Sequence, residues 1–377
     1  MTDWNAWAGE QLDALRALHR FRDPVPFDGD GPEGVVRGKR VVSFASNDYL
    51  GLAAHPAVRL AAISAIERFG TGAMASRLVV GTRSLHCELE REIAAWKHTE
   101  NALVFSSGYA ANIGVLTTLG LDDVTLFSDE LNHASIIDGC RLARARTLVY
   151  RHLDLEHLDQ MLRQTSGRKL VVTESVFSMD GDRAPLRALA ELCVEHGALL
   201  VLDEAHAVLG PELLHDYQAQ VLHVGTLSKT LGALGGFVAG SNRLIELLVN
   251  RARTFIFTTG LSPADTAAAL AAVRICESDE GERLRARLRS LIDLVRPGHP
   301  SAIVPVVLGE DSAALSAAAR LQEMGIHVPA IRPPTVPKGT SRLRVALSAA
   351  HTEVMVQLLR TALDRLANME LLTASHA

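Results

Sequence analysis

The 377-residue sequence predicts an α/β protein, with a large domain built on a mainly parallel sheet and a small α+β domain after it. Three observations lead to this fold class. From about residue 56, helical patterns alternate with short apolar runs such as 199–202 and 221–224, which is typical of strands buried on both faces. Hydrophobic residues make up 48% of the chain, enough for a large core. Residues 301–377 change to the order strand, helix, strand, strand, helix.

The first segment, residues 1–39, predicts a helical arm. Apolar side chains recur at helical spacing over residues 3–22. They are Trp4, Trp7, Leu12, Leu15 and Leu18. A polar stretch rich in Gly and Pro follows, and strand-like runs around Val35 and over 41–44 then predict a hairpin.

Residues 40–276 predict the large domain, and residues 277–377 predict the small one. Expected strands of the large domain lie at 102–105, 124–127, 148–150, 170–173, 199–202 and 221–224, and helical segments separate them. The small domain is expected to place strands at 302–307, 328–331 and 342–347 beside helices at 312–324 and 352–368. In sheets of this kind, ligands bind at the carboxyl ends of the strands.

Composition excludes several classes of function. A net charge of −5 and 5% aromatic residues argue against a nucleic-acid partner. The sequence lacks an uncharged apolar stretch of about 18 residues and a signal-peptide start, so we expect no membrane partner. Four widely spaced cysteines (Cys87, Cys140, Cys193 and Cys276) predict neither disulfides nor a metal site, and favour a cytoplasmic location.

Two reactive side chains follow neighbouring apolar strands. Asp203 and His206, in the motif DEAH, come after 199–202, and an acid at the end of a buried strand needs a positively charged partner. A protonated pyridinium nitrogen is one such partner, and a structural capping role for Asp203 is the alternative. Lys229, in a loop of small residues after 221–224, could form a Schiff base or could simply be solvated.

Two further segments are typical of anion and ring binding. The turn SSGYAAN opens a helix after 102–105 and directs backbone N–H groups at an anion, unless it is an ordinary helix cap. Thr226 and Ser228 add hydroxyl groups for a phosphate. His133 begins a helix after 124–127 and could stack on a flat ring or only cap that helix. Together with Asp203 and Lys229, these groups predict pyridoxal 5'-phosphate as the cofactor.

Eight motifs carry a family resemblance over residues 40–365. They are SNDYLGL (46–52), SSGYAAN (106–112), NHAS (132–135), TESVFSMDGD (173–182), DEAH (203–206), TLSKTLGALGG (226–236), FIFTTGLSP (255–263) and IRPPTVPKGTSRLR (331–344). The sequence resembles the α-oxoamine synthases, a branch of the fold-type I pyridoxal phosphate enzymes, and within them the branch that acts in biotin biosynthesis. RPPTVP is the motif that separates this branch from relatives that use other substrates.

The resemblance implies a role for each matching residue. Lys229 would form the Schiff base and move the Cα proton, and Asp203 would pair with the pyridinium nitrogen. His206 would hydrogen-bond the phenolic oxygen of the cofactor, and His133 would stack on its ring. Further cofactor contacts are implied for Gly108, Tyr109, Ser178 and Thr226. Thr258 and Thr259 would reach the phosphate in a neighbouring subunit, which implies a homodimer with shared active sites.

The resemblance also implies the substrates. Arg344 would bind the carboxylate of L-alanine, and Thr335 would contact an acyl thioester, either pimeloyl-CoA or a pimeloyl-carrier protein. The reaction would join the two with loss of CO2. Asn47 and Glu174 would support the site. Either Arg20 or Arg22 would meet the thioester, and the sequence leaves that choice open.

One segment departs from the family pattern. After DEAH, the residues AVLGPELLHDYQAQ lead directly into the next strand, which makes the loop after His206 short for the family. This leaves three alternatives to the biotin branch: a glycine C-acyltransferase or secondary-metabolism homologue, an aminotransferase, and a cofactor-binding paralogue without catalytic activity.

Overall fold

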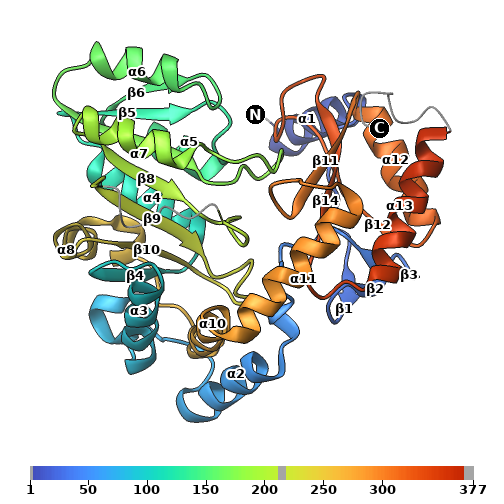
Figure 1. Ribbon diagram of the computed structural model, residues 1–377, viewed down its shortest axis with the longest axis horizontal. Coiled ribbons are helices and arrows are strands. Elements are labelled where there is room, and N and C mark those ends of the chain that lie inside the picture. The colour runs from blue at the N-terminus through green and yellow to red at the C-terminus, as the bar shows by residue number, and fades with distance from the viewer. Residues whose placement is uncertain (1–2, 211–217, 369–377) are drawn as a thin grey trace. The chain divides into compact units, whose positions relative to one another are not determined.

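A computed structural model describes residues 3–210 and 218–368 (Figure 1). The short loop after His206 therefore lies largely outside the described residues. The chain divides into two compact units, Asn47–Arg287 and a smaller one made of Met1–Ser46 with Leu288–Ala377. The N-terminal segment groups with the C-terminal one because strand β3 (Lys39–Ser43) pairs in parallel with β12 (Ile326–His327). The expected domain limits at residues 39 and 276 differ from this division into compact units, and stay a prediction about folding domains.

The large unit is built on a seven-stranded sheet in the order β4-β10-β9-β8-β7-β5-β6. The strands are β4 (Asn101–Phe105), β5 (Val124–Asp129), β6 (Arg146–Tyr150), β7 (Arg168–Glu174), β8 (Leu199–Asp203), β9 (Val221–Thr226) and β10 (Gly236–Gly240). Only β10 runs antiparallel to its neighbours in this sheet, so the predicted mainly parallel sheet is confirmed. The sequence analysis missed β10 as a strand, because its glycines weaken the strand pattern.

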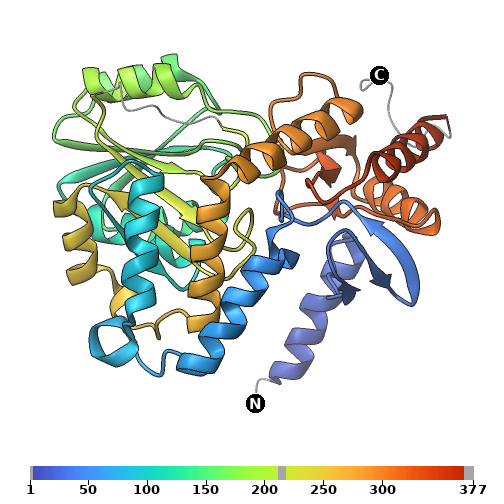
Figure 2. The same cartoon turned by 60° about the horizontal axis from the view of Figure 1, so that its bottom comes forward.

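Helices cover both faces of this sheet (Figure 1). They are α2 (Pro56–Phe69), α3 (Ser84–Trp96), α4 (Gly108–Leu119), α5 (Ala134–Leu142), α6 (Leu155–Arg163), α7 (Leu186–Glu195), α8 (Asn242–Arg251), α9 (Arg253–Ile256) and α10 (Pro263–Cys276), with short helical turns at Leu52–Ala54 and Arg77–Gly81. Helices α2 and α3 both pack against α10 (Figure 2). Helix α11 (Asp279–Val295) continues from the large unit into the smaller one.

Alternate residues of each strand enter different cores, which explains the continuous apolar runs. Leu126 and Val172 belong to one buried cluster, packed with residues of α4, α5 and α8. Phe127 and Val171 belong to the other, packed with residues of α6 and α7. Because successive side chains of a strand point to opposite faces, a sheet that is covered twice needs apolar residues at every position.

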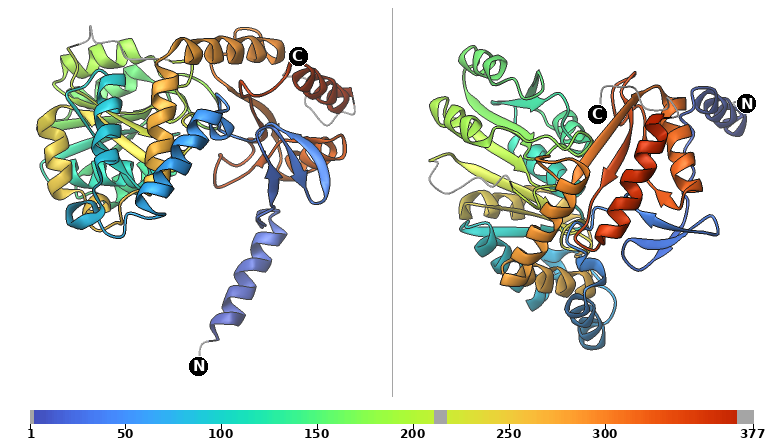
Figure 3. Two further views of the ribbon diagram at one scale, coloured as in Figure 1. Left: turned by 90° about the horizontal axis from the view of Figure 1, so that it is seen from below. Right: turned by 45° about the vertical axis from the view of Figure 1, so that its right-hand side comes forward.

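The smaller unit contains the N-terminal helix and two small sheets. Helix α1 (Trp4–Ala17) buries none of its residues and stands away from the strands that follow it (Figure 3). Strands β1 (Phe27–Gly29), β2 (Glu33–Val36) and β3 form one sheet with β12, and β11 (Ile303–Gly309), β14 (Ser341–Ala346) and β13 (Ala330–Ile331) form the other. Helices α12 (Asp311–Glu323) and α13 (Glu353–Asn368) complete the predicted α+β pattern. None of the helices in the described part of the chain is long and apolar enough to cross a membrane.

Candidate active site

The carboxyl edge of the large sheet gathers most of the side chains expected to act in chemistry. Glu174 and Asp203 are the last residues of β7 and β8 and are paired in register. His133, Ser178 and Lys229 lie in the segments that follow β5, β7 and β9. Because these strands are parallel, their carboxyl ends share one edge, and the structure therefore brings these residues together within a single unit.

A short hydrogen-bonded chain holds the amine of Lys229. Its Nζ lies 2.7 Å from Nε2 of His206, and Nδ1 of the same ring lies 2.6 Å from the hydroxyl of Tyr49. Tyr49 donates its hydroxyl hydrogen to Oδ1 of Asn47 at 3.0 Å. The Tyr49 oxygen therefore accepts the Nδ1–H of His206, which leaves Nε2 as the acceptor that faces Lys229.

A second chain of hydrogen bonds orients Asp203. The amide of Asn112 donates to Oδ2 of Asp203 at 2.7 Å and to Oγ of Ser135 at 2.9 Å. Ser135 in turn pairs with Nδ1 of His133 at 2.8 Å. Asp203 is buried, and its second oxygen accepts the backbone N–H of Ala205 at 2.9 Å. The acid is thus aimed by neutral donors, and these leave its negative charge uncompensated.

Glu174 lies beside Asp203 and is fully buried. Burial and the charge of Asp203 raise its pKa well above the usual range, so the side chain is neutral at pH 7. The backbone N–H groups of His133 and Ser178 are directed at its carboxyl group. Burial also lowers the pKa of His133, although one side of that ring is open to solvent. The neutral ring suits stacking on a flat group.

The N-terminus of α4 forms an anion cradle. Ser107 caps the helix by accepting the N–H of Ala110 at 3.0 Å, and the N–H groups of the first turn have no acceptor within the helix. A Cβ at Gly236 would lie 2.5 Å from the nitrogen of Gly108, so glycine is required for this close approach. Gly108 also packs on Thr226, whose hydroxyl pairs with that of Ser228 at 2.7 Å. Backbone donors and two hydroxyls therefore converge at one point.

The remaining predicted residues of the large unit lie apart from this network. The hydroxyl of Tyr109 is exposed and donates to Asp138 at 2.6 Å, which leaves its backbone N–H as its link to the cradle. Thr258 and Thr259 follow α9, where Thr259 forms a bridge with Ser76. Apolar side chains near this bridge are exposed by 54–76%. They are Met74, Leu78, Val79, Val80 and Phe257.

The predicted substrate residues belong to the smaller unit. Arg344 lies on β14 and is buried, whereas Thr335 is exposed in the loop before that strand. Nε of Arg20 lies 3.5 Å from a carboxylate oxygen of Asp311, so this arginine already has an acidic partner. Arg22 instead donates to the carbonyl oxygen of Pro333 at 3.4 Å, beside Arg332, whose pKa is lowered by burial and by the charge of Arg22.

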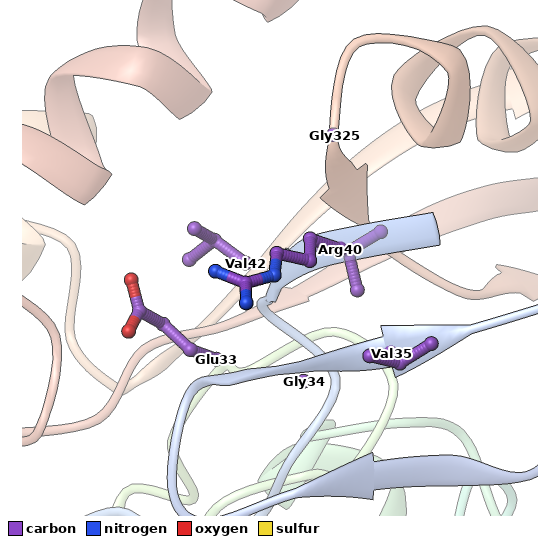
Figure 4. Close-up of a pocket in the computed structure, with 7 residues that line it drawn as sticks. Glu33, Gly34, Val35, Arg40, Val42 and Gly325 are labelled. Atoms are coloured by element: carbon purple, nitrogen blue, oxygen red, sulfur yellow. The ribbon is translucent and has the colours of Figure 1, made fainter. Parts of the chain in front are cut away.

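A hollow of about 380 Å³ in the smaller unit contains none of the predicted site residues. It lies along β2 and β3, and Figure 4 shows the side chains of Glu33 and Arg40 at its edge. In the large unit, a narrower hollow behind β8 is lined by Lys97, Glu204 and Thr226, among others.

Sequence reasoning missed three polar residues of the site. Tyr49, Asn112 and Ser135 lie within the motifs SNDYLGL, SSGYAAN and NHAS, yet no role was predicted for them. Tyr49 and His206 are 157 positions apart, and their contact has no local signal. Asn112 faces into the site from the first turns of α4, and its position there could have suggested a role.

Comparison with known proteins places these features in context. The family "Aminotransferase class I and II" matches residues 39–363. The chain is 52% identical over 371 residues to the 8-amino-7-oxononanoate synthase of Anaeromyxobacter dehalogenans, covering 93% of this chain and 92% of the relative. A structure of serine palmitoyltransferase from S. paucimobilis with bound PLP and myriocin has a TM-score of 0.91 at 31% identity, covering 98% and 99% of the two chains. An 8-amino-7-oxononanoate synthase structure from Francisella tularensis has a TM-score of 0.72 at 26% identity, covering 88% and 98%.

Proposed function

The chain belongs to the aminotransferase class I and II family, and from this premise we propose that it condenses L-alanine with a pimeloyl thioester to give 8-amino-7-oxononanoate. The bond formed joins Cα of alanine to the acyl carbon, and the products also include CO2 and the free thiol. The observation that carries the proposal is the convergence of Lys229, His206 and Asp203 at one edge of the sheet, in a chain with high identity to a synthase of that name.

The residues at this edge fit pyridoxal 5'-phosphate. The cradle at α4 would hold the phosphate through the N–H groups of Gly108 and Tyr109 and through the hydroxyl of Thr226, with Ser228 as its partner. A buried carboxylate aimed by Asn112 suits a protonated ring nitrogen. When bound, the cofactor supplies an electron sink that stabilises negative charge at Cα of the amino acid.

The two neighbouring acids would have different roles. Asp203 would keep its negative charge and bind the ring nitrogen, because Asn112 and the N–H of Ala205 stabilise the carboxylate. Glu174 is neutral and would add no second charge beside it. His133 would stack on the ring in its neutral form, and Ser178 would contact the cofactor from the loop after β7.

Lys229 would act as the proton-transfer group at Cα. Its amine is held 2.7 Å from His206, and Tyr49 and Asn47 determine which ring nitrogen faces it. A fixed orientation of the base lowers the entropic cost of reaching the transition state. His206 would also donate to the phenolic oxygen of the cofactor once Lys229 has moved to the substrate.

The smaller unit would supply the substrate contacts. Arg344 would bind the carboxylate of alanine, a task that suits the two parallel donors of a guanidinium group. Thr335 would contact the acyl thioester. Of the two N-terminal arginines, we favour Arg22 for an anionic part of the thioester, because Arg20 already pairs with Asp311 whereas Arg22 contacts a backbone carbonyl. The donor is pimeloyl-CoA or a pimeloyl-carrier protein.

A homodimer with shared sites is part of the proposal. The exposed apolar side chains beside the Ser76–Thr259 bridge support it, because a patch of that kind on a protein surface marks an interface. Thr258 and Thr259 would then reach the cofactor phosphate of the partner. Light scattering should report a dimer, and Val79→Arg should shift the mass towards the monomer. We also propose a cytoplasmic location, which agrees with four free cysteines in the described chain.

Thiol release tests the function directly. Protein loaded with pyridoxal phosphate is mixed with L-alanine and pimeloyl-CoA, and the product is identified by mass spectrometry. Glycine or L-serine with acetyl-CoA or palmitoyl-CoA serve as comparison substrates, since the serine palmitoyltransferase structure is a close structural neighbour. Preference for serine and palmitoyl-CoA would assign the chain to that related reaction. A failure of every pair, with the cofactor bound, would favour a paralogue without activity.

A further inference from the structure

His152, which has no role in the proposed reaction, lies directly after β6 and bridges two carboxylates. Its Nδ1 lies 2.9 Å from Oδ1 of Asp129, and its Nε2 lies 2.7 Å from Oδ2 of Asp182. The side chain of Asp129 is fully buried, and that of His152 is 19% exposed. The bridge is therefore a well-enclosed contact between segments that are distant in sequence.

The geometry requires a charged ring. Ionised carboxylates only accept hydrogen bonds, so both ring nitrogens of His152 must donate and the side chain is an imidazolium. Burial opposes that charge, but the hydrogen bonds to Asp129 and Asp182 outweigh it and raise the pKa to about 10. The charged groups that face His152 are Asp129 and Glu130 at the end of β5 and Asp182 in the loop after β7.

Asp129 is tied to the segment that carries His133. It is the last residue of β5 and lies four positions before His133. Its carboxylate also accepts the backbone N–H groups of Leu131 at 2.9 Å and Leu153 at 3.0 Å, and its carbonyl oxygen accepts that of Asn132 at 3.2 Å. The orientation of the turn that leads to His133 thus depends on where Asp129 is held.

Asp182 is tied in the same way to the loop that carries Ser178. It lies four positions after Ser178, and its carbonyl oxygen accepts the N–H of Phe177 at 3.0 Å. The ring of Phe177 meets the edge of the His152 ring, with 4.4 Å between centroids. The loop is anchored at its start by Ser175, whose N–H donates to the carbonyl oxygen of Asp203 at 2.8 Å.

From these contacts we propose that His152 is a positioning residue, which acts as an imidazolium bridge and holds the Ser178 loop against the turn that carries His133. The proposal rests on the proposed function, because it is for the cofactor that these two side chains need a fixed separation. His152 itself would not touch the cofactor. Without the bridge, Asp129 and Asp182 become two facing carboxylates that repel each other, and the loop separates from the end of β5.

His152→Gln tests this with two readouts. Pyridoxal phosphate affinity, measured by absorbance titration, should weaken by about 10- to 100-fold, the loss seen when a group that orients a metal ligand is removed. Amide hydrogen exchange of residues 175–184, measured without the cofactor, should become faster than in the wild type. His196→Gln is the matched control, because it breaks a similar pair, His196 with Asp159 at 2.7 Å, between α6 and α7. That variant should change neither readout.

A rescue variant separates positioning from general damage. In His152→Gln/Asp182→Asn, the glutamine amide can donate to Asp129 while its oxygen accepts from the asparagine, so affinity should return to within about threefold of the wild type. Unchanged affinity and unchanged exchange in His152→Gln would overturn the proposal, and so would a double variant no better than the single one. If the wild type takes up no pyridoxal phosphate, the proposed function fails, and the exchange measurement still decides whether the bridge holds the loop.

Discussion

Replacing Glu204 with glutamine is expected to lower the free energy of unfolding by about 3 kcal/mol at pH 7, the cost of breaking a buried ion pair. Oε2 of Glu204 lies 2.8 Å from Nζ of Lys97, and Oε1 lies 3.1 Å from Nδ1 of His223. The Glu204 side chain is 4% exposed and that of Lys97 is 12% exposed. The variant therefore leaves a buried ammonium group without its counter-charge.

The pKa of Glu204 leads to a similar magnitude. Burial opposes ionisation, but Lys97 and His223 outweigh it and lower the pKa from 4.5 to about 2. At about 1.4 kcal/mol per pKa unit, this difference corresponds to roughly 3 kcal/mol. Because the folded-state pKa is the lower one, the contribution is complete above pH 4.5 and is lost as the pH falls towards 2.

Urea denaturation followed by circular dichroism is the assay, at pH 7 and at several values down to pH 3. The stability difference between wild type and Glu204→Gln should shrink as the pH falls. Glu92→Gln is the matched control, since Glu92 pairs with Arg274 on the surface and should cost less than about 1 kcal/mol. A Glu204→Gln protein as stable as the control at pH 7 would refute the reasoning, and so would a difference that does not depend on pH.

Three further predictions concern the site and its support. His152→Gln should cost roughly 1–3 kcal/mol of stability near pH 6.5, and the difference from wild type should vanish as the pH rises through about 10, because the folded-state pKa is raised; urea denaturation between pH 6.5 and 10 measures this. Gly236→Ala should weaken pyridoxal phosphate binding by more than about tenfold, because the new Cβ would lie 2.5 Å from the nitrogen of Gly108 and distort the cradle; absorbance titration would show it, and wild-type affinity would contradict the role of the cradle. Tyr49→Phe should lower kcat about tenfold while changing stability by no more than about 1.5 kcal/mol, because only the hydrogen bond to His206 is lost; steady-state thiol release with denaturation curves tests this, and an unchanged kcat would contradict it.

Prediction from sequence worked best where the signal is local. The runs at 199–202 and 221–224 appear as strands β8 and β9, and the residues after them, His206 and Lys229, come together as the parallel-sheet rule requires. It failed where local pattern and tertiary context disagree. Strand β10 is rich in glycine, and only its position between β4 and β9 makes it a strand. The apolar spacing of α1 predicted an amphipathic helix, and the helix forms without burying any residue.

What the sequence determined by itself is the chemical inventory and its order: an acid, a lysine, a capped helix and a histidine, each directly after an apolar strand. Periodicity and strand-end position depend on neighbouring residues, so they can be read along the chain. Only the tertiary structure decided how these groups are oriented. Tyr49 sets the acceptor nitrogen of His206, Asn112 aims Asp203, and His152 joins two acids. Each of these contacts links positions far apart in the chain, because a hydrogen bond depends on distance in space and carries no signature in the local sequence.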